Sequence, residues 1–261
     1  MGEATLSTHT VRHEGAELTY DLRGAGPLLL LIAGLGGDGA RYSGLGEQLS
    51  DEFTVLTYDR RGTGRSTGRD TDFDMAQQAR DAAAVIRSAR PAARAAVFGQ
   101  GGGGSIAFEL AAHLPDVVTE LVVHEAPSVP LLPDAPQRLA FVREVRTTYE
   151  RRGAAAALAL WGASPADFAG PAAADHFLGR EFLPIALYSP DLDAVRRTGI
   201  PVVTAAGTGS RDVCHARAAR VQAEHLACRC VEFPGDHLGF VSEPALFADA
   251  LAKELTGLRR A

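Results

Sequence analysis

Long apolar runs, cysteine and lysine are all scarce in this sequence. The longest apolar run, residues 27–33, is far shorter than the ~20 residues that a membrane-spanning helix needs. The first 12 residues show no apolar stretch behind a basic start, so we expect neither a membrane span nor a signal peptide. The three cysteines (Cys214, Cys228 and Cys230) are too few for a disulfide framework or a four-ligand zinc site, and they indicate a cytoplasmic protein with reduced thiols.

The composition is that of an ordinary globular protein. Of the 261 residues, 46% are hydrophobic and 22% are charged, which is enough apolar material for the core of one large domain or two smaller ones. The net charge of −6 gives no reason to expect a nucleic-acid partner. Lys253 is the only lysine, which we attribute to a GC-rich bacterial genome and not to function.

Short apolar or alternating runs are separated along the chain by runs with helical spacing. Because strands that alternate with helices form parallel sheets covered on both faces, the pattern predicts an α/β fold with a mostly parallel sheet. The expected strands are residues 17–23, 28–33, 53–58, 95–98, 121–124, 200–206 and 230–233. The expected helices are residues 74–87, 106–113, 138–151, 154–161 and 244–258.

Residues 128–197 interrupt the alternation with helical runs and several aromatics. An insertion of this kind between two strands predicts a helical cap over the carboxyl edge of the sheet, where open α/β sheets bind their ligands. The expected division is a core of residues 1–127 and 198–261 with a cap of residues 128–197. The alternative is a set of surface helices with buried aromatics.

Four loops follow predicted strands in a distinctive order. They are Ala33-Gly34-Leu35-Gly36-Gly37, the stretch from Asp59 to Ser66, the glycine turn of residues 99–104, and Pro234-Gly235-Asp236-His237. In this order and spacing the chain resembles the α/β-hydrolase family over almost its whole length, with a cap between the sixth and seventh large strands. The resemblance implies an eight-stranded, mostly parallel sheet flanked by helices.

The nucleophile position of that family departs from the family pattern here. The family carries Gly-x-Ser-x-Gly on a sharp strand-to-helix turn. The corresponding residues here are Gly99-Gln100-Gly101-Gly102-Gly103, so Gly101 stands where the family has its serine. Glycine has no side chain and forms no acyl-enzyme. Ser105 lies one helical turn further on, where we expect it to pack against a neighbouring element.

The resemblance implies that His237 is the catalytic histidine. Imidazole exchanges protons near pH 7, and a catalytic imidazole needs a carboxylate to orient it. Two carboxylates are candidates: Asp212, near the usual family position, and Glu125, at the end of the sixth strand. We prefer Glu125, because a charge that directly ends an apolar strand needs a reason to be there. Asp236 is expected only to shape the turn.

The resemblance also implies an oxyanion hole made of the backbone N–H groups of Leu35 and Gly102. Glycines that open a helix leave N–H donors without intrahelical partners, and these suit a carboxylate, an enolate or a polarised carbonyl. The alternative is that the glycines only allow close packing of helix against strand.

The same glycines match the dinucleotide-binding pattern G-x-G-x-x-G, with Glu125 lying 21 residues beyond Gly104. This alternative leaves the Asp59–Ser66 and His237 loops without a role. A Walker loop is excluded, because no lysine follows the glycines.

The sequence leaves three functions open. The first is an enzyme that uses His237 as a general acid/base on a small apolar carbonyl or ester compound. Its reaction would be elimination, isomerisation, carbon–carbon cleavage or hydrolysis by water, as in the tailoring of secondary metabolites. The second is a serine hydrolase whose nucleophile has been replaced at position 101, and the third is a binder without catalysis. We expect a small-molecule substrate, no cofactor and no metal, and the sequence leaves a homo-oligomer open.

Overall fold

The computed structural model of the protein describes residues 5–69 and 71–260 and contains one eight-stranded sheet. The strands are β1 (Ser7–His13), β2 (Ala16–Arg23), β3 (Leu28–Ile32), β4 (Thr54–Tyr58), β5 (Ala95–Gln100), β6 (Val118–His124), β7 (Val202–Gly207) and β8 (Cys230–Phe233). Their order is β1-β2-β4-β3-β5-β6-β7-β8. The pairs β1–β2 and β2–β4 are antiparallel and the other pairs are parallel, which confirms the mostly parallel sheet.

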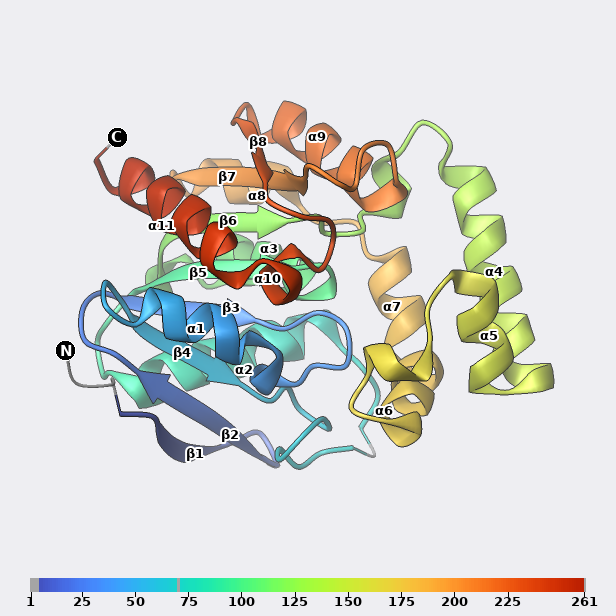
Figure 1. Ribbon diagram of the computed structural model, residues 1–261, viewed down its shortest axis with the longest axis horizontal. Coiled ribbons are helices and arrows are strands. Elements are labelled where there is room, and N and C mark those ends of the chain that lie inside the picture. Colours follow the sequence, from blue (N-terminus) through green and yellow to red (C-terminus); the bar gives the residue numbers. More distant parts are fainter. Residues whose placement is uncertain (1–4, 70, 261) are drawn as a thin grey trace.

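Helices cover both faces of the sheet (Figure 1). One face carries α1 (Ser43–Leu49), α10 (Gly239–Ser242) and α11 (Pro244–Arg260). The other face carries α2 (Met75–Ala89), α3 (Gly102–His113), α8 (Leu192–Arg197) and α9 (Cys214–Leu226). The short 3-10 helices η1 (Gly39–Tyr42) and η2 (Pro115–Val117) lie in connections.

Successive strand residues contribute to the core on opposite sides of the sheet. On β6, Leu121 and Val123 pack beneath α2 and α3, whereas Val122 packs beneath α1 and α11. This is the period of two that a strand buried on both faces must have. Both apolar layers hold the carboxyl ends of the parallel strands at one edge of the sheet.

The connection between β6 and β7 extends beyond that edge of the sheet (Figure 1). It contains η3 (Val129–Leu131), α4 (Ala135–Arg152), α5 (Ala154–Trp161), η4 (Pro165–Asp167), α6 (Pro171–His176), the π-helix η5 (Phe177–Glu181), α7 (Phe182–Leu187) and α8. Helices α4 to α7 share an apolar cluster of their own, but Leu192 and Val195 of α8 belong to the core beneath α3. The expected cap segment, 128–197, therefore ends with a helix that packs against the core.

The helices of the described residues do not meet the requirements of a membrane-spanning helix. Among residues 5–69 and 71–260, no helix combines the length and the apolar character that crossing a bilayer demands.

Candidate active site

The site is built around a sharp bend between β5 and α3. Gly101 joins the two elements with φ 56° and ψ −125°, a backbone conformation that L side chains rarely adopt. The bend also brings α3 very close to β3, since a Cβ on Gly103 would lie 2.0 Å from the carbonyl oxygen of Ile32. Glycine at 103 is therefore needed for packing, as the packing alternative proposed.

His237 follows β8 and lies directly beside this bend. A Cβ built on Gly101 would lie 3.2 Å from Nε2 of His237. Nδ1 of the same ring lies 2.7 Å from Oε2 of Glu125, and Nε2 lies 2.7 Å from Nε2 of Gln100. A carboxylate only accepts hydrogen bonds and an amide nitrogen only donates them, so this network assigns the ring proton to Nδ1 and the lone pair to Nε2.

Glu125 is the carboxylate that the structure brings to His237. It is fully buried at the end of β6 and has φ 52°, which is uncommon for a residue other than glycine. Its Oε1 accepts the N–H of Gly207 at 2.8 Å. Burial raises the pKa of the Glu125 carboxyl, but the hydrogen bond from His237 and the nearby imidazoles lower it to about 2, so the group is ionised at neutral pH.

Asp212 does not join this group, because its side chain is 92% exposed and lies 3.5 Å from Arg220. Asp236 accepts the N–H of Leu238 at 2.8 Å and thus shapes the turn that carries His237. Ser105 is buried within α3, and the hydrogen bonds of the His237 ring go to Glu125 and Gln100 instead.

A second imidazole, from His215 at the start of α9, contacts the same carboxylate. Its Nε2 lies 3.2 Å from Oε2 of Glu125, and its ring centroid lies 4.2 Å from that of His237. Burial lowers the pKa of His215 to about 4, and the neighbouring His237 adds to this effect. His215 is therefore neutral at pH 7 and leaves the charge on Glu125 uncompensated.

The two residues expected to supply backbone N–H groups line a single cavity. Leu35 and Gly102 both line the cavity next to Gly101 and His237. Gly102 is the first residue of α3, so its N–H has no partner within the helix. The loop before Leu35 is held from behind by Arg60, whose Nε and Nη2 donate to the carbonyls of Ala33 and Gly34 at 2.9 Å each.

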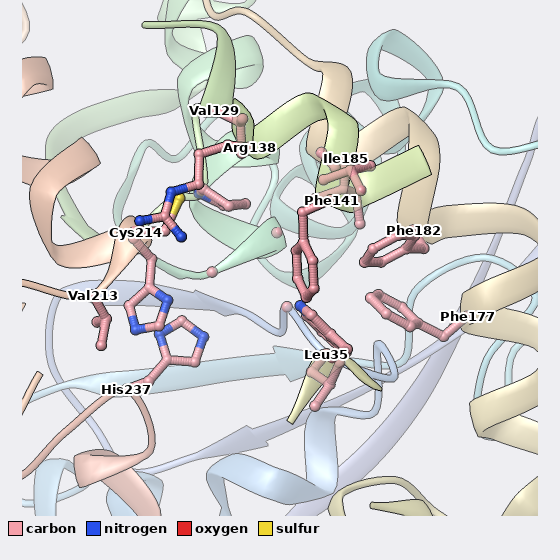
Figure 2. Close-up of a pocket in the computed structure, with 18 residues that line it drawn as sticks. Leu35, Val129, Arg138, Phe141, Phe177, Phe182, Ile185, Val213, Cys214 and His237 are labelled. Atoms are coloured by element: carbon pink, nitrogen blue, oxygen red, sulfur yellow. The ribbon is translucent and has the colours of Figure 1, made fainter. Parts of the chain in front are cut away.

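The cavity at the bend has a volume of about 300 Å³ and lies between the sheet edge and helices α4, α5 and α7. Its walls differ in character. Figure 2 shows one side formed by Val129, Arg138, Val213, Cys214 and His237 and the other by Leu35, Phe141, Phe177, Phe182 and Ile185. A mostly apolar cavity with a few converging polar groups is typical of a small-molecule site.

A metal ion fits this group of residues poorly. His124, Glu125 and His237 offer ligand atoms within 4.8 Å of one another. However, the 2.7 Å between Nδ1 of His237 and Oε2 of Glu125 is the length of a charge-assisted hydrogen bond. The ring of His124 lies in the aromatic core, stacked on Phe233, and is fully buried. The geometry is that of an oriented imidazole and not of a ligand set.

The dinucleotide alternative also finds no support in this geometry. Glu125 would have to accept the hydroxyls of a ribose, but its carboxylate is fully buried and faces His237, His215 and the N–H of Gly207.

Three residues of the site were not expected from the sequence: Gln100, His215 and Arg60. Gln100 is the variable residue of the glycine motif, and His215 follows β7 after a loop without a recognisable pattern. Arg60 belongs to the Asp59–Ser66 loop, which contributes to the family resemblance but whose residues were assigned no role from the sequence. Gln100 ends β5, Arg60 lies in the loop after β4, and His215 lies at the start of the helix after β7. This position near the carboxyl ends of the strands was the one signal available.

Comparison with known proteins agrees with the fold. Residues 27–197 match the family described as the alpha/beta hydrolase fold. The uncharacterized hydrolase YraK of Bacillus subtilis is 28% identical over 265 residues, which cover 95% of each chain. Among solved structures, a thermophilic esterase from Thermogutta terrifontis superposes with a TM-score of 0.75 at 20% identity, covering 98% of this chain and 99% of the esterase. The enol-lactonase from Burkholderia xenovorans gives 0.68 at 20% identity, with 95% and 100% covered.

The chain therefore belongs to the α/β hydrolase fold family. The family match and the relative named as a hydrolase support a hydrolase-type protein.

Proposed function

We propose that this protein is a hydrolase-type enzyme in which His237 acts as general acid/base without a covalent nucleophile at position 101. The observation that carries the proposal is the position of Nε2 of His237, 3.2 Å from where a side chain on Gly101 would begin. Glu125 orients the ring through Nδ1. The substrate is a small apolar molecule with a carbonyl or ester group, enclosed in the cavity beneath α4, α5 and α7 as under a cap.

The chemistry follows from the tautomer of His237. Nε2 carries the lone pair and accepts from the amide of Gln100 at 2.7 Å. The proposed mechanism requires this amide to move so that a water molecule takes its place at Nε2. The water gives its proton to Nε2 as its oxygen attacks the carbonyl, and the imidazolium then protonates the leaving group. Glu125 stays ionised throughout and stabilises the imidazolium.

Negative charge develops on the carbonyl oxygen as water attacks, and backbone N–H groups are available to stabilise it. The N–H groups of Leu35 and Gly102 form the oxyanion hole in this proposal, and the positive end of α3 adds to their field. Removal of a proton next to a carbonyl would use the same groups and would support elimination, isomerisation or carbon–carbon cleavage. The relative named as a hydrolase favours attack by water.

A second candidate is a serine hydrolase whose nucleophile has been replaced. The same distance supports it, because a serine at position 101 would present its side chain to Nε2 of His237. Such a serine would occupy φ 56°, and a residue with a side chain in this region stores about 1–3 kcal/mol of strain. The two candidates differ in whether the chain with Gly101 turns over an ester.

Substitution of His237 tests the proposal. With p-nitrophenyl butyrate as the probe, we expect His237→Ala to lower the initial rate by about 10²–10⁴-fold, the usual contribution of a general base. Glu125→Gln should lower it as well, whereas Asp212→Asn should not, because Asp212 faces solvent. His225→Ala, on the exposed face of α9, controls for hydrolysis by surface imidazoles. Equal rates for wild type and His237→Ala would refute the mechanism.

From the sequence we further propose a cytoplasmic location and a role in secondary metabolism, and the sequence leaves a homo-oligomer open.

A further inference from the structure

The cavity contains a single side chain of fixed charge among the described residues that line it. This side chain is Arg138 of α4, and most of the other lining residues are apolar or aromatic. Arginine keeps its charge at any physiological pH. His237 lies on the same side of the cavity as Arg138 (Figure 2). The second imidazole that lines the cavity, His215, contacts the ionised Glu125, as His237 does.

The guanidinium of Arg138 is held by Asp134, which does not fully neutralise its charge. Its Nε donates to Oδ2 of Asp134 at 3.0 Å, one turn earlier on the helix. The same carboxylate accepts two hydrogen bonds from Arg217, at 2.6 and 3.0 Å. One negative charge is thus shared by two positive ones, so the cluster keeps an excess of one positive charge. The contact with Asp134 uses only Nε, and both terminal nitrogens of Arg138 remain available to a ligand.

These observations define the kind of molecule that the cavity accommodates. We propose that the substrate carries a single carboxylate, which binds the terminal nitrogens of Arg138 while the apolar body lies against the wall formed by Phe141, Phe177 and Phe182. The planar guanidinium matches the two oxygens of a carboxylate. A phosphate dianion would need two cations, whereas the described lining residues supply Arg138 alone. This inference deepens the proposed function and rests on it, since it names the substrate class of the same site.

A pair of ligands that differ only in charge tests the inference without turnover. The probes are 4-phenylbutanoate and its neutral amide, 4-phenylbutanamide, titrated by isothermal calorimetry or ligand-observed NMR. We expect the wild type to bind the carboxylate about tenfold more tightly or better, as a charge-assisted hydrogen bond predicts. Arg138→Met should bring the ratio close to one, and Arg138→Lys should retain part of the preference.

Arg143→Met is the matched control. Arg143 is an exposed arginine on the same helix that does not line the cavity, so its removal changes the net charge equally. The carboxylate preference should survive in this variant. Circular dichroism and thermal unfolding establish that each variant is folded. Equal affinities for the two probes, no binding of either, or an unchanged preference in Arg138→Met would overturn the inference.

Failure of the proposed function would look different. His237→Ala should keep the carboxylate preference, because Arg138 is held by Asp134 and not by His237. Unchanged turnover in His237→Ala with an intact preference would therefore refute the mechanism alone. The carboxylate preference is measured by binding alone, so its loss in Arg138→Met does not depend on any rate.

Discussion

At the residue scale, the candidate site consists of one carboxylate, Glu125, and the imidazoles around it. The sequence favoured Glu125 over Asp212 because Glu125 ends an apolar strand, and the structure places Glu125 against His237 while Asp212 faces solvent. No pattern in the sequence indicated His215, which contacts Glu125 although it lies 90 residues further along the chain, at the start of α9. Contacts of this kind depend on how loops after different strands meet, and no local spacing encodes that.

A third imidazole, that of His124, should make the free energy of unfolding depend on pH. Neither ring nitrogen of His124 has a hydrogen-bond partner among the described residues, and the ring stacks between Phe98 and Phe233. Burial lowers the pKa of His124 to about 3, and His215 shifts in the same direction. Both are neutral when folded but take up protons near pH 6.5 when unfolded, so the free energy of unfolding falls as the pH falls below about 6.5.

Replacement of that ring should flatten this dependence. His124→Phe keeps an aromatic ring in the stack and removes one proton from the linkage. We expect the slope of the unfolding free energy between pH 6 and 5 to decrease by about 1.4 kcal/mol per pH unit. Urea unfolding at several pH values measures it, in a range above the acid-induced loss of the Glu125 contribution. Parallel curves for wild type and His124→Phe would show that the shift does not exist.

At the scale of elements, Arg60 joins the core to the helices above it. It follows β4, donates to two carbonyls of the loop after β3, and its Nη2 contacts Oε2 of Glu181 in η5 at 2.6 Å. Both charges of this pair are fully buried. The sequence predicted α4 and α5 from their helical patterns, but an ion pair between residues 121 positions apart leaves no trace in periodicity.

Removal of one charge of this pair should be costly. Glu181→Gln leaves the Arg60 guanidinium buried without a counter-charge, and we expect a loss of about 3–5 kcal/mol in the free energy of unfolding. Glu150→Gln, which breaks the exposed pair with Arg146, is the control and should cost less than about 1 kcal/mol. Trp161 is the single tryptophan and stacks on Phe177 of η5, so its fluorescence reports on these helices. A Glu181→Gln variant as stable as the control would show that the pair does not secure them.

At the scale of the whole molecule, the sequence predicts the buried strands of the sheet better than its exposed edge. Buried strands of a parallel sheet are short apolar runs, and every such run expected from the sequence is a strand in the structure. Strand β1 was missed because it is an exposed edge strand without an apolar face. Helix α1 contains Gly44 and Gly46, so it forms through packing against α11 and not through intrinsic propensity.

The candidate site was also predictable only in part: the sequence indicated the loops that carry it but not the walls of the cavity. The loops that carry Gly101 and His237 follow strands, and parallel strands bring such loops to one edge. Most of the apolar and aromatic wall of the cavity, by contrast, comes from α4, α5, η5 and α7, whose placement depends on tertiary packing and the Arg60–Glu181 pair.

The central claim is that this chain acts on a carbonyl group without a covalent intermediate. The early time course of p-nitrophenol release from p-nitrophenyl butyrate, read together with the intact mass of the acid-quenched protein, tests it most directly. Wild type should release product linearly from the first turnover with no gain in mass, while Gly101→Ser serves as the comparator that is able to form a butyryl adduct. A burst of one equivalent with a butyryl group on the wild-type chain, or product from Gly101→Ser alone, would contradict the account.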